Sequence, residues 1–187
     1  MRKIKNTEQE RTIECKFIPL FGSIDSHLSK DVVLSIMKER KKAIIIIINS
    51  EGGEVASGGA IIDAMRWTDV PVYTLVIGAS YSMAFNISIM GDKRFCTPLS
   101  TFMMHDTQYD FSPYSHPTDI NDLVNFQKNV DNDLNKMILE KTKITKQELI
   151  ASLDSRRDIY YDSKTAIKKK VVDHIIDNED DLIKYLI

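Results

Sequence analysis

Ser82 and His105 are the residues of this sequence with the clearest capacity for chemistry. Ser82 lies in the segment 78–84 (Gly-Ala-Ser-Tyr-Ser-Met-Ala), after an apolar run at 72–77 that predicts a strand and before an apolar stretch that predicts a helix. We expect the strand to break at Gly78 and Ser82 to stand at the helix N-terminus, where unpaired N–H groups and the helix dipole stabilise negative charge. His105 ends a second short apolar run, and imidazole is the base that a serine nucleophile needs. The pattern indicates hydrolysis by an activated serine.

Each of these residues also has a purely structural explanation. Serine is preferred at the start of a helix because its hydroxyl caps backbone N–H groups, and Ser80 lies in the same turn as Ser82. A histidine taken alone is more often structural than catalytic. His105 is the favoured base because the other histidines lack a comparable context; these are His27, His116 and His174.

Composition narrows the classes of function. The chain has 187 residues, 43% of them hydrophobic, which suits a single domain; we place it at 17–187, after a short polar segment at 1–16. The net charge of -2 gives no electrostatic reason to bind nucleic acid or a membrane surface. Cys15 and Cys96 suggest neither a disulfide framework nor a zinc site. Without a secretory signal or a membrane-spanning apolar run, we expect a cytoplasmic protein that holds no metal.

Hydrophobic spacing predicts strands that alternate with helices. The isoleucine-rich run at 43–48 is apolar on both faces, which is typical of a central parallel strand. Such alternation implies an α/β fold with a parallel sheet covered by helices. In the first half of the chain we expect a strand at 17–20, a turn at Gly22, a helix at 30–42, and strands at 43–48 and 72–77 with a helix between them that stops before Asp69. A helix from Ser82 to Gly91 and a loop at 106–117 should follow. The second half should contain a long amphipathic helix from Asp119, with Thr118 or Asp119 as its cap, and a shorter helix that begins at a capping box at Thr145.

Several motifs follow one another as they do in the proteolytic subunit of the Clp protease. The chain resembles this family from about residue 17 to residue 176, and an ordered set of motifs is more specific than any single one. Residues 48–53 (Ile-Asn-Ser-Glu-Gly-Gly) resemble the turn Ile-Asn-Ser-Pro-Gly-Gly, 78–84 resemble Gly-Gln-Ala-Ala-Ser-Met-Gly, 103–105 resemble Met-Ile-His, 157–160 resemble an Arg-Asp-aromatic segment, and 166–173 resemble a helix that ends in Gly-Leu-Val-Asp.

The resemblance implies a role for five residues. Ser82 would be the nucleophile, His105 the general base and Asp158 the acid that orients the imidazole. The backbone N–H groups of Gly53 and Met83 would form the oxyanion hole. Local sequence agrees, because Met83 follows the nucleophile at a helix N-terminus and a glycine lets the backbone approach the substrate closely.

The acid has two competitors close by in the sequence, Asp154 and Asp162. An aspartate beside Arg156 and Arg157 is also explained by a surface ion pair, which would contribute little energy.

The chain departs from the family pattern around the expected site. Glu51 replaces a proline beside the oxyanion-hole glycine, Tyr81 replaces the alanine before the nucleophile, and Ala84 replaces the glycine after it. Residues 106–114 differ from the segment that binds peptide and joins two rings in the family. Arg156 stands in place of the aspartate of an Asp-Arg pair linked to contacts between rings.

The resemblance also implies an architecture and partners. It predicts a Clp–crotonase-like fold, with repeated strand-strand-helix turns and a projecting long helix, acting as a serine endopeptidase. The chain would form a homo-oligomer of two stacked heptameric rings, and a hexameric AAA+ unfoldase would supply polypeptide substrates. The partner would use ATP, so this subunit needs no cofactor.

Three alternatives stay open at this point. The departures at Glu51, Tyr81 and Arg156 favour a catalytically silent structural subunit of a mixed ring. The stretch 89–92 and the short interval between Ser82 and the histidine resemble phage capsid-maturation proteases. A crotonase-type acyl-CoA enzyme would share the oxyanion hole without needing the triad.

Overall fold

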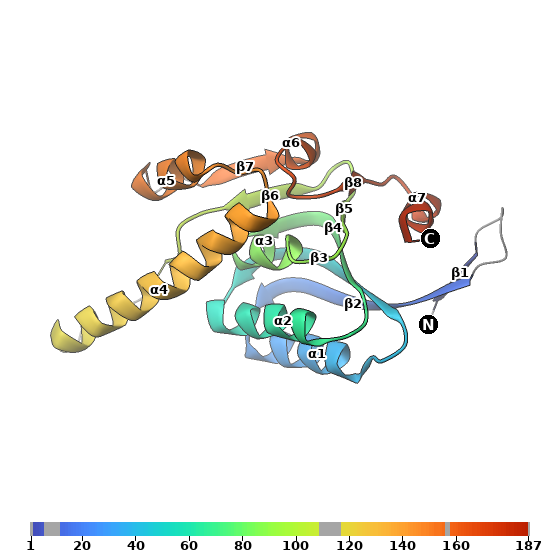
Figure 1. Ribbon diagram of the computed structural model, residues 1–187, viewed down its shortest axis with the longest axis horizontal. Coiled ribbons are helices and arrows are strands. Elements are labelled where there is room, and N and C mark those ends of the chain that lie inside the picture. Colours follow the sequence, from blue (N-terminus) through green and yellow to red (C-terminus); the bar gives the residue numbers. More distant parts are fainter. Residues whose placement is uncertain (1, 6–11, 109–116, 156–157, 187) are drawn as a thin grey trace.

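The computed structural model shows a mixed sheet, in which most strand pairs are parallel, covered by helices (Figure 1). It describes residues 2–5, 12–108, 117–155 and 158–186. The strands are β1 (Arg2–Lys5), β2 (Thr12–Ile24), β3 (Ala43–Gly53), β4 (Val72–Tyr81), β5 (Arg94–Cys96), β6 (Thr101–Met104), β7 (Ile159–Asp162) and β8 (His174–Ile175). The helices are α1 (Ser26–Lys38), α2 (Val55–Trp67), α3 (Met83–Ser88), α4 (Pro117–Lys141), α5 (Lys146–Ser155), α6 (Ser163–Lys168) and α7 (Glu179–Leu186). The expected α/β class is confirmed.

The centre of the sheet is the parallel set β2, β3 and β4, in which β3 pairs on both sides. Its side chains alternate between two apolar layers because successive residues of a strand point to opposite faces. Ile44, Ile46 and Ile48 belong to the larger core, which includes residues of α1, α2 and α3. Ile45 belongs to the smaller core on the other face, together with Leu182 of α7. This two-sided burial explains why the sequence of β3 is continuously apolar.

Strand β4 is longer than β5 and β6, and it pairs with both of them in succession along its length. Its first half, Thr74 to Val76, pairs with β5, and its last residues, Ala79 to Tyr81, pair with β6. Strand β6 in turn pairs antiparallel with β7. Because β4 pairs with β6 at its end, the C-terminal ends of β4 and β6 lie side by side. This arrangement positions the candidate site.

Several boundaries differ from the expectations. Strand β4 does not break at Gly78 but continues to Tyr81, and the following helix α3 ends at Ser88. The turn expected at Gly22 is instead an irregularity inside β2, where the register with β3 shifts between Phe21 and Ser23. These strands persist because neighbouring strands on the sheet supply hydrogen bonds that outweigh local glycine preferences.

Three other boundaries lie away from the expected ones. Strand β2 is much longer than 17–20 and starts inside the segment expected to be a short polar one at 1–16. Strand β1 pairs with it in the antiparallel direction. Helix α1 begins and ends about four residues earlier than 30–42, because Asp25 caps it through its contacts with the backbone N–H groups of His27 and Leu28. Helix α4 begins at Pro117, ahead of the expected caps. Most of the loop expected at 106–117 lies outside the described residues.

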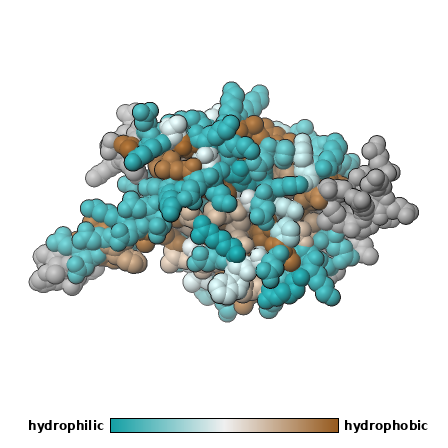
Figure 2. All heavy atoms as spheres, viewed as in Figure 1, coloured by the Kyte–Doolittle hydropathy of each residue, from teal (hydrophilic) through white to brown (hydrophobic). Residues whose placement is uncertain are grey.

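The capping box at Thr145 is confirmed. The Thr145 backbone N–H donates to Glu148 Oε2 at 2.8 Å, and the Glu148 N–H donates back to Thr145 Oγ1 at 3.2 Å. Helix α4 projects from the body, as the resemblance implied, and its visible surface is mainly hydrophilic (Figures 1 and 2). Of the helices in the described ranges, none combines the length and apolar character that crossing a membrane requires.

Candidate active site

Ser82 and His105 are brought together by the pairing of β4 with β6. The two strands are parallel, and Tyr81 is the register partner of Met103. The backbone N–H of Ser82 continues this contact by donating to the Met103 carbonyl at 2.9 Å. A residue that follows β4 therefore lies beside the residues that end β6. Both expected catalytic residues stand at the carboxyl ends of neighbouring parallel strands, where sites in open α/β sheets are commonly found.

Ser82 adopts a backbone conformation that a serine rarely takes. Its φ of 53° and ψ of -122° lie outside the helical and extended regions. Within the described chain, its hydroxyl makes no capping bond to α3, although the residue occupies the N-cap position. The hydroxyl instead forms a 2.7 Å hydrogen bond with His105 Nε2. The structural explanation of Ser82 as an ordinary cap is therefore wrong, and the unusual backbone presents its hydroxyl to the imidazole.

This pair has the geometry of a nucleophile and its base. For Ser82 to donate to Nε2, the neutral imidazole must carry its proton on Nδ1. Ser80 is not an alternative nucleophile, because its side chain is fully buried and its hydroxyl has no hydrogen-bond partner among the described residues. His27 is exposed on α1, and His174 is stacked on Tyr185 at the other end of the sheet. His116 lies outside the described residues.

The turn at the end of β3 packs directly against Ser82. Gly52 has a φ of +99°, and a Cβ built on it would be 2.7 Å from both the Ser82 Cβ and the Tyr81 carbonyl oxygen. Gly53 has a φ of +151°, and its Cβ would be 2.3 Å from the Ile24 carbonyl oxygen. Ser50 secures the turn, since its hydroxyl donates to the Gly22 carbonyl and accepts the Gly52 N–H. Only glycine fits at both positions.

The two expected oxyanion-hole residues, Gly53 and Met83, line the same cavity as Ser82. Met83 is the first residue of α3, and the N–H of a first helical residue has no partner within its own helix. Two N–H groups so placed are the type of donor that stabilises a developing oxyanion.

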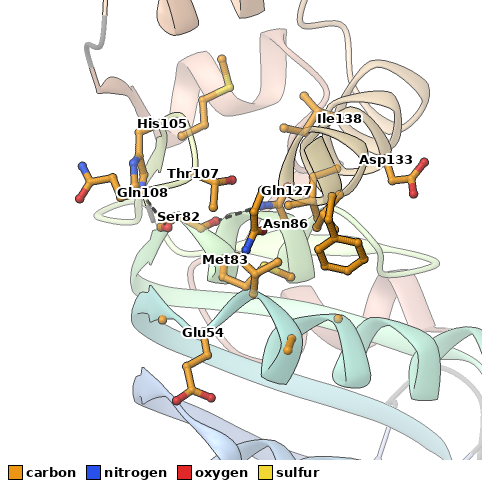
Figure 3. Close-up of a pocket in the computed structure, with 18 residues that line it drawn as sticks. Glu54, Ser82, Met83, Asn86, His105, Thr107, Gln108, Gln127, Asp133 and Ile138 are labelled. Atoms are coloured by element: carbon orange, nitrogen blue, oxygen red, sulfur yellow. Dashed lines mark hydrogen bonds between the residues drawn. The ribbon is translucent and has the colours of Figure 1, made fainter. Parts of the chain in front are cut away.

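A cavity of about 840 Å³ opens beside the Ser82 hydroxyl. Figure 3 shows Ser82 and His105 pointing toward one another at one side of it, whereas Glu54 and Asp133 point away. The wall opposite Ser82 and His105 comes from α4. Its lining residues there, at helical spacing, are Phe126, Val130, Leu134 and Ile138. The amphipathic periodicity of α4 was visible in the sequence, but its contribution to this cavity was not.

Asp158 lies next to His105, but the two side chains are not bonded to one another. Strands β6 and β7 pair Met104 with Ile159, so the same antiparallel register extended by one residue places Asp158 opposite His105. Among the described residues, the Asp158 carboxylate accepts its side-chain hydrogen bond from the Tyr160 hydroxyl, at 3.2 Å, and none from His105. The structure thus contains a serine-histidine pair with an aspartate beside it.

The competing aspartates differ from Asp158 in position or in use. Asp162 Oδ1 accepts the Thr165 N–H at 2.7 Å and so caps α6. This hydrogen bonding to Thr165 lowers the pKa of the Asp162 carboxyl. Asp154 falls within α5, and its side chain lies outside the described part, as do Arg156 and Arg157.

The last expected motif, at 166–173, has a structural role. Arg94 forms a two-armed ion pair with Asp173, with distances of 2.8 and 3.0 Å, and a third nitrogen donates to the Lys141 carbonyl at 2.7 Å. Burial raises the pKa of the Asp173 carboxyl, but the hydrogen bonds and charge of Arg94 outweigh it, and the net shift is downward.

Elsewhere, burial raises the pKa of the Cys96 thiol to about 12. No cluster of three or more possible metal ligands occurs in the described residues.

Comparison with known proteins agrees with this geometry. The sequence model described as Clp protease matches residues 3–179. The chain belongs to the Clp protease family. It is 24% identical to the ATP-dependent Clp protease proteolytic subunit of Streptococcus suis (strain 98HAH33) over 174 residues, covering 90% of this chain and 88% of that protein.

Two further relatives of this chain are also named ATP-dependent Clp protease proteolytic subunit. The protein of Streptococcus mutans serotype c (strain ATCC 700610 / UA159) is 24% identical over 176 residues, covering 91% of this chain and 89% of the relative. That of Streptococcus pneumoniae (strain Hungary19A-6) is 25% identical over 174 residues, covering 90% and 88%. The similarity extends over most of both chains, although the sequences have diverged widely.

Proposed function

We propose that this protein is a serine endopeptidase that works as the proteolytic subunit of a Clp assembly. The observation that carries the proposal is the 2.7 Å hydrogen bond between Ser82 Oγ and His105 Nε2, at the mouth of a cavity large enough for a substrate side chain. The family match and the shared name of the relatives support it. A catalytically silent subunit has no need of a strained serine aimed at an imidazole.

In the proposed reaction, the Ser82 oxygen attacks the carbonyl carbon of the scissile peptide bond while His105 Nε2 takes the hydroxyl proton. The negative charge that develops on the carbonyl oxygen is stabilised by the N–H groups of Gly53 and Met83. The imidazolium then gives its proton to the departing amine, and an acyl-enzyme remains on Ser82. A water molecule, deprotonated by His105, releases the acyl group and restores the serine.

Asp158 completes the proposed triad by accepting a hydrogen bond from His105 Nδ1. Its carboxylate would hold the imidazole in the productive tautomer and stabilise the imidazolium. The register of β6 with β7 supports this assignment, because Met104 pairs with Ile159, and His105 and Asp158 are the next residue on each side of that pair.

The proposed assembly follows the name of the relatives, which describes an ATP-dependent protease. We propose stacked heptameric rings of this chain in the cytoplasm, supplied with polypeptides by a hexameric AAA+ unfoldase. ATP would be consumed by that partner, and no cofactor would be held by this subunit.

Labelling with a fluorophosphonate tests the activity directly, because such probes react with an activated serine hydroxyl. The purified protein should be labelled at Ser82 and should cleave short fluorogenic peptides, and Ser82→Ala should lose both properties while keeping its native mass. Labelling at another serine, or none with the fully assembled protein, would contradict the proposal. Native mass measurement on the same samples reports the number of subunits.

A further inference from the structure

Tyr160 is placed to compete with His105 for the Asp158 carboxylate. Asp158 and Tyr160 are two residues apart on an extended segment, so their side chains project from the same face. The β6–β7 register puts His105 on that face as well, opposite Asp158. Two donors thus flank the carboxylate along this face, the Tyr160 hydroxyl on its own segment and the His105 imidazole on the extended register of β6, and the carboxylate bonds the hydroxyl.

The Tyr160 ring is itself held by a residue next to the nucleophile. Its ring meets the Tyr81 ring edge to face, with centroids 6.0 Å apart and an interplanar angle of 87°. Tyr81 is in turn fixed by a 2.9 Å hydrogen bond between its hydroxyl and Thr101 Oγ1. A chain of contacts thus runs from Thr101 of β6 through the residue before Ser82 to the candidate acid. Tyr81 is one of the positions at which the sequence departs from the family pattern.

We propose that Tyr160 is a positioning residue that draws the Asp158 carboxylate away from His105, so that the base works without its acid until this hydrogen bond opens. This inference rests on the proposed function, because it concerns Asp158, the third member of the proposed triad. It also explains the Tyr81–Tyr160 contact, because that contact keeps the competing hydroxyl in place.

The strength of this competition is limited. At 3.2 Å the Tyr160–Asp158 bond is longer than is usual between two oxygens, and the Tyr160 side chain is 61% exposed. Donation to the carboxylate raises the pKa of the Tyr160 hydroxyl, so this hydroxyl keeps the proton that it donates across the neutral range. A single hydrogen bond of this kind biases an equilibrium by about two- to tenfold, which sets the size of the expected effect.

Tyr160→Phe tests the proposal, because it removes the competing hydroxyl and keeps the ring that packs on Tyr81. Tyr161→Phe is the matched control: it makes the same change on the next residue of β7, where the hydroxyl contacts Met104 Sδ and not Asp158. A third protein, Tyr160→Phe with Asp158→Asn, removes the carboxylate that the first variant releases.

Two readouts are needed, one of which does not depend on activity. The first is the pKa of the His105 imidazole, followed by NMR of histidine-labelled protein and assigned with His105→Gln. The second is the rate of fluorophosphonate labelling at Ser82. Asp106 and Asp131 line the same small hollow as His105, so their charges act on it equally in every variant and cancel in the comparison.

We expect Tyr160→Phe to raise the His105 pKa by about 0.3 to 1 unit, the equivalent of a two- to tenfold effect, since a neighbouring carboxylate favours the imidazolium. Labelling should become about two- to tenfold faster. Both changes should be absent from Tyr161→Phe and from the double variant. An unchanged or lowered His105 pKa in Tyr160→Phe would overturn the inference. Failure of the proposed function has a different signature, namely no labelling of Ser82 in any variant, and the histidine titration still decides the role of Tyr160 in that case.

Discussion

Gly52 lies against Ser82 so closely that a Cβ on the glycine would be 2.7 Å from the Cβ of the serine. The contact joins the end of β3 to the unusual backbone of the residue after β4. Because Gly52 also has a φ of +99°, a side chain there would meet both backbone strain and a collision. The position of the Ser82 hydroxyl relative to His105 therefore depends on the absence of a side chain in a different strand.

Gly52→Ala should lower peptide cleavage and fluorophosphonate labelling by about a hundredfold or more, because a shift of about 1 Å in a reacting group has an effect of that size. Its free energy of unfolding should fall by about 1–3 kcal/mol. Gly59→Ala is the control for stability, since a Cβ at Gly59 meets nothing within 4 Å and alanine favours the helix. Thermal unfolding and labelling rates check both variants, and full labelling of Gly52→Ala would disprove the contact's importance.

The identity of the acid is tested by three Asp→Asn changes. Asp158→Asn should reduce kcat by at least about tenfold with little effect on unfolding, because no carboxylate can then orient the imidazole when the Tyr160–Asp158 hydrogen bond opens. Asp162→Asn should leave kcat and stability nearly unchanged, since asparagine also caps a helix well. If Asp154→Asn does the greatest harm to kcat, the assignment of Asp158 is wrong.

The Arg94–Asp173 ion pair should make stability depend on pH in the acid range. Asp173→Asn should lower the free energy of unfolding by about 3 kcal/mol at neutral pH, since Arg94 is then left without its counter-charge. The folded-state pKa of Asp173 is lowered, so its contribution is fully present above its unfolded pKa of about 3.9 and is lost as pH falls through the lower folded value.

Urea unfolding of both proteins across pH 2 to 7 provides the measurement. The difference between them should be constant above about pH 5 and should shrink below about pH 4. Lys170→Gln serves as a control, because its 3.5 Å contact with Asp173 is exposed and should contribute less than about 1 kcal/mol. A difference that grows on acidification would show that Asp173 is not stabilised as a carboxylate.

Cleavage of a short unstructured peptide would need only the Ser82–His105 pair and its surroundings, whereas a folded protein must first be unfolded before its backbone can reach this site. We therefore expect the isolated protein to cleave short unstructured peptides without ATP and to degrade a stable folded protein only when an ATP-dependent unfoldase is added. Parallel assays with both substrates make the comparison. Efficient degradation of the folded substrate without ATP would contradict the proposed assembly.

The sequence alone determined the features that depend on local pattern. The continuous apolar character of 43–48 predicted a buried central strand, the capping box at Thr145 predicted a helix start, and the order of motifs singled out Ser82 and His105. The first two signals lie within a few neighbouring residues, where burial on both faces and backbone capping directly restrict residue type, and the third is the order of short motifs along the chain.

The tertiary structure alone decided what depends on residues far apart in the chain. Strand β4 continues through Gly78 because pairing with β6 stabilises its last residues, and Gly52 packs against Ser82. The tertiary structure also turned Asp158 toward Tyr160 rather than His105. Which donor the carboxylate bonds depends on side-chain positions that the packing of β6 against β7 sets, and no spacing along the sequence encodes such positions.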